Sequence, residues 1–173
     1  MKLGQYIVKR LEQLHVTHIF GLPGDYNMQL LDHIEDSNKL QWVGCANELN
    51  ASYAADGYAR AANRPAVLVT TFGVGELSAL NGVAGSYTEM LPVLHIVGMP
   101  PSAAQANHLW MHHTLGGNLY NAYYNMSQHI SCDAALIGWS QRDLDNAPSH
   151  VDRGILSMLL EKHTAYIVIP GEF

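Results

Sequence analysis

The chain has 173 residues and a formal net charge of −6, and 48% of its residues are hydrophobic while only 14% are charged. This composition excludes an intrinsically disordered chain, which would be poor in apolar residues and rich in charge. The largest cluster of basic residues is the pair Lys9-Arg10, so the sequence offers no basic patch for nucleic acid. Because an average globular domain carries about 25% charged residues, we expect part of this surface to be covered by a partner.

Neither a membrane anchor nor an export signal is expected from the sequence. No apolar run reaches the roughly 18–20 residues of a membrane helix, and no signal-peptide core follows Met1. The two cysteines, Cys45 and Cys132, form neither a C-x-x-C pair nor a zinc-ribbon spacing. We therefore expect a soluble, cytoplasmic protein with reduced cysteines and no membrane partner.

Helices and strands are predicted to alternate along the chain. Apolar residues at Leu3, Ile7, Leu11 and Leu14 have the spacing of an amphipathic first helix. The predicted strands are His18–Phe20, Gln41–Gly44, Ala66–Thr71, Val93–Val97, Ala134–Ile137 and Tyr166–Ile169. The later helices are predicted around Met28, Leu31 and Ile34 and over Glu48–Ala62, Glu76–Tyr87 and Val151–Glu161. From Met99 to Ser127 the periodicity decays.

This alternation predicts an α/β fold, a doubly wound sheet of about six mostly parallel strands with helices on both faces. The carboxyl ends of parallel strands meet at one edge of the sheet, which is where such proteins bind ligands. Three segments that follow strands, around Asp25, Glu48 and Val74, are therefore expected to converge there. Since the last strand is followed only by Pro170–Phe173, we expect either one compact domain or the first domain of a longer protein.

Two acidic residues at this edge have both a functional and a structural interpretation. Glu48 follows a strand and opens a helix that Asn47 can cap, so its carboxylate either serves a ligand or stabilises its own helix. Asp25 follows the turn after the first strand, where it either caps the next helix or faces the ligand. The sequence pattern leaves both alternatives open.

Two further motifs suggest ligand sites without completing one. The turn Gly73-Val74-Gly75 has two glycines of a dinucleotide-binding turn, but Ser78 replaces the third, and a tight strand-to-helix turn explains the pair as well. His108 and His112 could share a metal if they lay four apart on a helix, but no Cys, Asp or Glu stands near them. The adjacent imidazoles of His112 and His113 suit acid–base or hydrogen-bonding roles better, and solvent-facing loop histidines are an equal alternative.

Five motifs occur in the order GLPGDYN (21–27), NELNA (47–51), YAADGYAR (53–60), TTFGVGELSALNG (70–82) and HHTLG (112–116). With them the chain resembles the N-terminal, pyrimidine-binding domain of the thiamine-diphosphate-dependent 2-oxo acid decarboxylases, the pyruvate decarboxylase family. The resemblance extends over essentially all of residues 1–173, which we therefore expect to form one such domain.

The resemblance implies thiamine diphosphate as a cofactor and assigns residues to it. Glu48 would hydrogen-bond the pyrimidine ring and promote removal of the thiazolium C2 proton, a role that requires a poorly solvated carboxyl. Pro23, Gly24 and Val74 would line the pyrimidine. The thiazolium would then act as the electron sink for loss of carbon dioxide.

The resemblance also implies a substrate and partners. Asp25, His112 and His113 would bind the carboxylate of a small 2-oxo acid, pyruvate or a relative, and handle protons during aldehyde release. The family's motif for the diphosphate and Mg²⁺, Gly-Asp-Gly followed by Asn-Asn, is absent from this sequence, so we expect that domain elsewhere.

Each active site would then lie between this domain and a diphosphate-binding domain, in a homo-oligomer or in association with a separate chain. We therefore expect this chain alone to be catalytically incomplete. The alternative is a non-catalytic binding module that has the same fold.

Overall fold

The computed structural model describes residues 1–172. The strands are β1 (His18–Gly21), β2 (Gln41–Gly44), β3 (Ala66–Thr71), β4 (Val93–Met99), β5 (Asp133–Leu136) and β6 (Ala165–Pro170). They form one six-stranded sheet in the order β2-β1-β3-β4-β6-β5, and every neighbouring pair is parallel. The predicted α/β sheet is confirmed.

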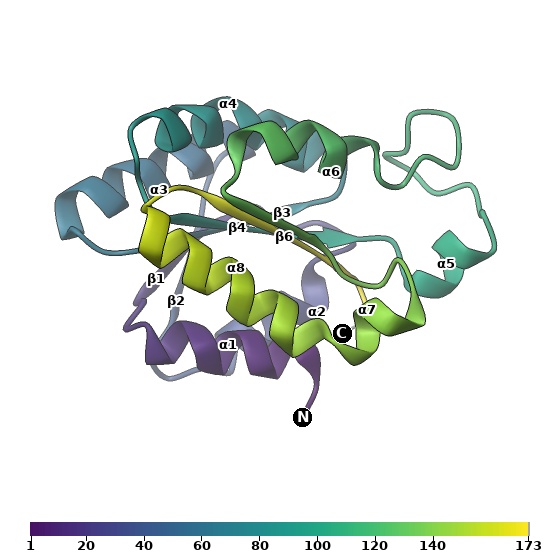
Figure 1. Cartoon of the computed structure of the whole chain (residues 1–173), viewed down its shortest axis with the longest axis horizontal. Helices are drawn as coiled ribbons and strands as arrows, with labels where there is room; N and C mark the ends of the chain where they lie inside the picture. Colours follow the sequence, from purple (N-terminus) through teal and green to yellow (C-terminus); the bar gives the residue numbers. More distant parts are fainter. Residues whose placement is uncertain (173) are drawn as a thin grey trace.

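Helices cover both faces of this sheet. The helices are α1 (Leu3–Gln13), α2 (Met28–Glu35), α3 (Glu48–Ala62), α4 (Val74–Thr88), α5 (Ser102–Ala106), α6 (Ala122–Ser127), α7 (Gln141–Asp145) and α8 (Ala147–Glu161). A short 3₁₀ turn, η1, spans Gln128–Ile130. Figure 1 shows α3, α4 and α6 on one side of the sheet and α1, α2 and α8 on the other.

The strongest sequence patterns give the best agreement with these bounds. The strand Ala66–Thr71 and the helix Glu48–Ala62 have their predicted ends, and the Asn47 side chain caps that helix by accepting the Asn50 N–H at 2.9 Å. The fourth helix begins at Val74 instead of Glu76, because the sharp backbone turn is complete at Gly73 (φ +74°). Helices α5, α6 and α7 are too short to show a periodic pattern, so the sequence does not predict them.

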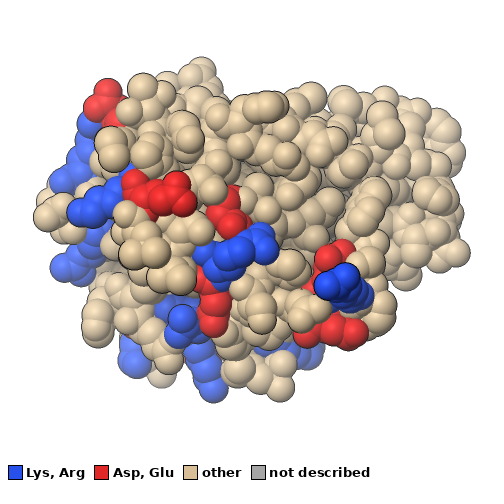
Figure 2. All heavy atoms as spheres, viewed as in Figure 1, with Lys and Arg blue, Asp and Glu red and all other residues tan. Residues whose placement is uncertain are grey.

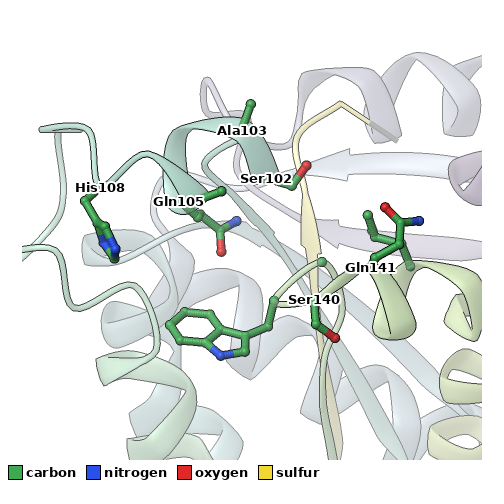
Figure 3. A pocket seen from close by; sticks show the side chains of 10 residues that line it. Ser102, Ala103, Gln105, His108, Ser140 and Gln141 are labelled. Carbon is green, nitrogen blue, oxygen red and sulfur yellow. The ribbon is translucent and has the colours of Figure 1, made fainter.

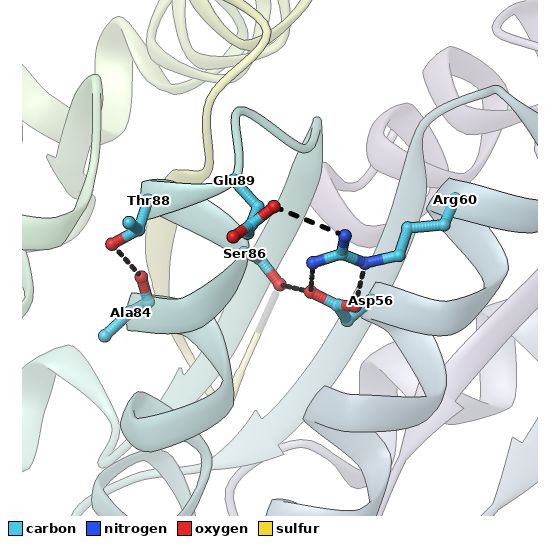
Figure 4. Close-up of polar contacts among 6 residues, drawn as sticks. All are labelled: Asp56, Arg60, Ala84, Ser86, Thr88 and Glu89. Carbon is cyan, nitrogen blue, oxygen red and sulfur yellow. Dashed lines mark hydrogen bonds and ion pairs between the residues drawn. The ribbon is translucent and has the colours of Figure 1, made fainter.

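The helices on the two faces pack through different kinds of side chain. On one face, α1, α2 and α8 contribute large aliphatic residues such as Leu11, Ile34 and Ile155. On the other, α3 presents Ala51, Ala55 and Ala59, and small residues let α3 and α4 approach closely. A polar cluster holds α3 to the end of α4: Figure 4 shows Asp56 between Arg60 (2.6 Å) and the Ser86 hydroxyl (2.8 Å), with Glu89 beside Arg60.

Charged side chains are unevenly distributed over the surface. In Figure 2 they gather over the left and lower parts of the view, while the upper right carries none. That region contains α6 and the long segment that leads to it (Figure 1), and the sequence has no Asp, Glu, Lys or Arg from Met90 to Cys132. Within residues 1–172, no helix has both the length and the apolar composition that crossing a membrane requires.

Candidate active site at the carboxyl edge of the sheet

The candidate site lies where the chain leaves two neighbouring strands in opposite directions. After β1 the chain continues to β2 on one side, and after β3 it continues to β4 on the other. In open α/β sheets, ligands bind at such a switch of direction, outside the carboxyl ends of the strands. The turn after β1 carries Pro23, Gly24 and Asp25, and the turn after β3 carries Gly73 and leads to Val74.

Two glycine turns and one carboxylate meet at Thr71, the last residue of β3. A Cβ atom on Gly24 would lie 2.5 Å from Thr71 Cβ, and one on Gly75 would lie 2.9 Å from both Thr71 Cγ2 and Glu48 Oε1. Only glycine therefore lets both turns pack so closely. We call Gly24, Thr71, Gly75 and Glu48 the glycine cradle. Thr71 Oγ1 is buried in it and has no hydrogen-bond partner among residues 1–172.

The structure places Glu48 at the first position of α3, half-buried and next to the first turn of α4. The cap at Asn47 fixes this end of α3, so the position of the carboxylate follows from local sequence as well as from packing. Pro23 is exposed, and Val74 is 56% exposed, so both present surface that a ligand could cover.

Asp25, His112 and Tyr26 form a second group beside the cradle. His112 Nε2 lies 3.2 Å from Asp25 Oδ2, and the Tyr26 ring stacks on the imidazole at 4.7 Å with an interplanar angle of 20°. The Tyr26 hydroxyl is 3.0 Å from His112 Nδ1 and donates to the His112 carbonyl at 3.2 Å. Burial, reinforced by the charge of Asp25, raises the pKa of Tyr26 to about 12, so this hydroxyl keeps its proton.

His113 is held on both its side chain and its backbone. Its Nδ1 lies 3.2 Å from the Phe72 carbonyl, which can only accept, so Nδ1 carries the proton and the neutral ring has Nε2 as its acceptor. The Tyr123 hydroxyl donates to the His113 carbonyl at 2.7 Å. The backbone of His113 has φ +68°, a conformation that few non-glycine residues adopt. The centroids of the His112 and His113 rings are 4.7 Å apart.

The structure corrects the interpretation of Asp25 as a helix cap. Helix α2 begins at Met28 and its N-terminal flanking residue is Asn27, not Asp25. The Asn27 side chain accepts the Gly24 N–H at 2.9 Å and the Asn27 N–H donates to the Gly24 carbonyl, so a closed turn delays the start of the helix. The carboxylate of Asp25 is consequently free to pair with His112.

The shared metal site of His108 and His112 is also not formed on a helix. Helix α5 ends at Ala106, and His108 has φ +52°, which interrupts helical geometry between the two histidines. Within residues 1–172, no group of three or more His, Cys, Asp or Glu side chains is placed to hold a metal ion.

Three residues of the site have no assigned role in the sequence analysis. Tyr26 directly follows Asp25 in the first motif, and Thr71 ends a strand at the ligand edge, so position alone could have indicated both. Tyr123 lies in the aperiodic segment, where no sequence signal points to it.

A separate hollow lies beside the segments that follow β4 and β5. It has a volume of about 490 Å³ and is lined among others by Ser102, Gln105, His108, Trp139 and Ser140 (Figure 3). It contains none of the residues that the family resemblance assigns to the cofactor or the substrate, and no carboxylate lines it. We therefore place the candidate site at Glu48 and the paired imidazoles and not at this hollow.

Comparison with known proteins agrees with this geometry. The family model described as "Thiamine pyrophosphate enzyme, N-terminal TPP binding domain" matches residues 1–126. Over 169 residues, 98% of this chain, the sequence is 51% identical to pyruvate decarboxylase isozyme 3 of Saccharomyces cerevisiae and 49% identical to the pyruvate decarboxylase of Kluyveromyces marxianus. The chain spans 29% of the length of each of these relatives. It belongs to the thiamine pyrophosphate enzymes and carries their N-terminal TPP binding domain.

Proposed function

We propose that this chain is the cofactor-activating part of a thiamine-diphosphate-dependent decarboxylase that converts pyruvate or a related 2-oxo acid to an aldehyde and carbon dioxide. The observation that carries the proposal is the position of Glu48, half-buried against Gly75 in the glycine cradle. The 51% identity to a pyruvate decarboxylase supports this choice of reaction.

The residues of the glycine cradle fit the aminopyrimidine of thiamine diphosphate. Glu48 supplies a carboxyl that can share a proton with a ring nitrogen, and the unpaired Thr71 hydroxyl is a further polar atom in the cradle. Pro23 and Val74 offer exposed apolar surface for the ring to cover. The bound cofactor supplies an electron sink for decarboxylation. Gly24 lies in the turn after β1, which packs against Thr71 and forms one side of the cradle.

The second group of residues handles the substrate and its protons. His112 faces Asp25 through Nε2 and the Tyr26 hydroxyl through Nδ1, so it would pass protons to and from the substrate as part of this group. His113 presents Nε2 as an acceptor, since its Nδ1–H is committed to the Phe72 carbonyl. The Asp25–His112 pair thus lies beside the acceptor nitrogen of His113.

The cofactor's diphosphate and its Mg²⁺ require groups from outside residues 1–172, in which no cluster of metal-binding side chains occurs. The uncharged surface between Met90 and Cys132 suits burial against such a partner, a second subunit or a diphosphate-binding domain. We therefore expect the purified 173-residue chain with pyruvate, thiamine diphosphate and Mg²⁺ to release carbon dioxide no faster than the protein-free mixture. Sustained turnover by this chain alone would contradict the proposal that the active site needs a second, diphosphate-binding domain.

The decisive test of the proposal is Glu48→Gln in a longer protein that carries this domain. Loss of the carboxyl proton should slow exchange of the cofactor's C2 proton with deuterium by about 10²–10⁴-fold, measured by quenched-flow and proton NMR. The half-exposed position makes a large loss of stability unexpected. Glu35→Gln, an exposed carboxyl in α2, is the matched control and should leave exchange unchanged. Rapid exchange in the Glu48→Gln protein would exclude the assigned role.

A further inference from the structure

Glu76 in the first turn of α4 is a buried carboxyl that the proposed mechanism does not use. Its side chain is only 1% exposed. One oxygen, Oε1, accepts the backbone N–H of Gly73 at 2.7 Å, while Oε2 is buried without a partner among residues 1–172. Enclosing a carboxyl in this way is costly, and helix capping alone does not require it, since capping carboxylates work at exposed helix ends.

The residue that Glu76 fixes, Gly73, lies directly against His113. A Cβ atom on Gly73 would be 2.6 Å from the His113 carbonyl oxygen and 2.9 Å from His113 Cβ. The preceding carbonyl, that of Phe72, is the acceptor for His113 Nδ1. The turn 72–73 therefore contacts the histidine through both its backbone and its ring. Any movement of this turn would displace His113.

We propose that Glu76 is a positioning residue for His113. By holding the Gly73 N–H, its carboxyl fixes the direction of the Phe72 carbonyl, and that carbonyl selects the Nδ1–H tautomer of His113. Tyr123 completes the arrangement by donating to the His113 carbonyl from the α6 side. The effect of Glu76 on catalysis rests on the proposed function, because a misplaced His113 would present the wrong nitrogen to the substrate. The effect of Glu76 on the tautomer of His113 does not depend on the proposed function.

The tautomer of His113 can be read directly in the 173-residue chain labelled with ¹⁵N and ¹³C histidine. The wild-type ring should give the nitrogen and Cδ2 shifts of the Nδ1–H form. Glu76→Leu, which keeps most of the volume but removes the acceptor, should shift His113 toward the Nε2–H form that histidine prefers in water. Glu76→Ala, which removes the acceptor together with most of the side-chain volume, should shift His113 toward the same Nε2–H form. Glu76→Gln, whose amide oxygen can accept the Gly73 N–H, should retain the wild-type signature.

A destabilised control separates positioning from a general loss of stability. Ile155→Ala removes a buried side chain from α8, on the opposite face of the sheet, and should leave the His113 signals unchanged. Wild-type signals in both Glu76→Leu and Glu76→Ala would overturn the proposal. The same shift in Ile155→Ala would overturn it as well, because the tautomer would then follow stability.

The catalytic consequence is tested in a longer protein that carries this domain and decarboxylates pyruvate. Glu76→Leu should lower kcat by about a hundredfold with a smaller change in KM, and Glu76→Gln should restore most of it. An unchanged kcat in Glu76→Leu would remove the catalytic part of the proposal. If Glu48→Gln leaves C2 exchange fast while the tautomer still responds to Glu76→Leu, the proposed function fails and the positioning role stands.

Discussion

Burial changes the proton affinity of two side chains that lie on different elements, Glu76 in α4 and His95 in β4. Desolvation raises the pKa of Glu76 from 4.5 to about 8, although the hydrogen bond from Gly73 opposes the change. Desolvation lowers the pKa of His95 from 6.5 to about 3, and its Nε2 lies 2.9 Å from the Thr70 hydroxyl. Around pH 6 both side chains are therefore uncharged in the folded protein.

Glu76 should make the folded chain less stable as the pH rises. Between pH 4.5 and about 8 the unfolded carboxyl loses its proton while the folded one keeps it, so the free energy of unfolding falls by up to about 1.4 kcal/mol per pH unit. Glu76→Gln cannot ionise and lacks this slope. We expect its stability relative to wild type to rise by a few kcal/mol from about pH 5 to about pH 8, measured by urea unfolding. If the free energies of unfolding of Glu76→Gln and wild type changed with pH in parallel, this prediction would be wrong.

Close packing of α3 against α4 places the start of both helices beside the site. Gly82 is central to this contact, since a Cβ there would lie 2.1 Å from Ser52 Oγ and 2.8 Å from Ser52 Cβ. Both helices begin at the glycine cradle, α3 with Glu48 and α4 with Val74. A change in the distance between the helices would therefore alter the approach of Glu48 to Gly75.

Two glycines of the same helix should respond oppositely to alanine. Gly82→Ala forces α3 and α4 apart and should lower the free energy of unfolding by about 1–3 kcal/mol. A Cβ on Gly85 would meet no atom within 4 Å, so Gly85→Ala should raise it by about 0.5–1 kcal/mol through better helix propensity. Urea unfolding of both variants measures the contrast. A loss of stability in Gly85→Ala equal to that in Gly82→Ala would show that packing against Ser52 is not the cause.

For the molecule as a whole, stability against pH has two opposing contributions. Below pH 6.5 the unfolded His95 binds a proton that the folded ring refuses until about pH 3, so His95 makes stability fall as the pH falls. From pH 4.5 to 6.5 this slope offsets that of Glu76. With both groups present, the free energy of unfolding should change little between pH 4.5 and 6.5. It should fall above pH 6.5 because of Glu76 and below pH 4.5 because of His95.

His95→Gln tests the acid side of this profile. The amide does not titrate and can still bond Thr70, so the slope of Glu76 is no longer offset. As the pH falls from 6.5 to about 4.5, the free energy of unfolding of the variant should rise relative to that of wild type by up to about 1.4 kcal/mol per pH unit. Urea unfolding at these two pH values measures the difference. His33→Gln, a half-buried histidine in α2, is the control and should follow wild type. Equal acid sensitivity of His95→Gln and wild type would contradict the burial argument.

The sequence by itself determines the alternation of elements, because each strand and each long helix has a local pattern. The run Ala66–Thr71 and the cap at Asn47 give their elements correct bounds without reference to the rest of the chain. The sequence motifs also single out Glu48 and the His112-His113 pair, since only a few types of side chain can hold or transfer a proton in such a site. No such pattern covers the residues between α5 and α6, whose conformation follows from contacts with other elements.

The tertiary structure alone decides which of these residues act together. It pairs Asp25 with His112, where local sequence equally allows a helix cap, and it sets the φ +68° backbone of His113 against the turn after β3. It also makes Glu76 a buried group, although its place in the sequence resembles that of an ordinary capping residue. Local preferences depend on neighbours in the chain, whereas burial and pairing depend on segments that only folding brings together.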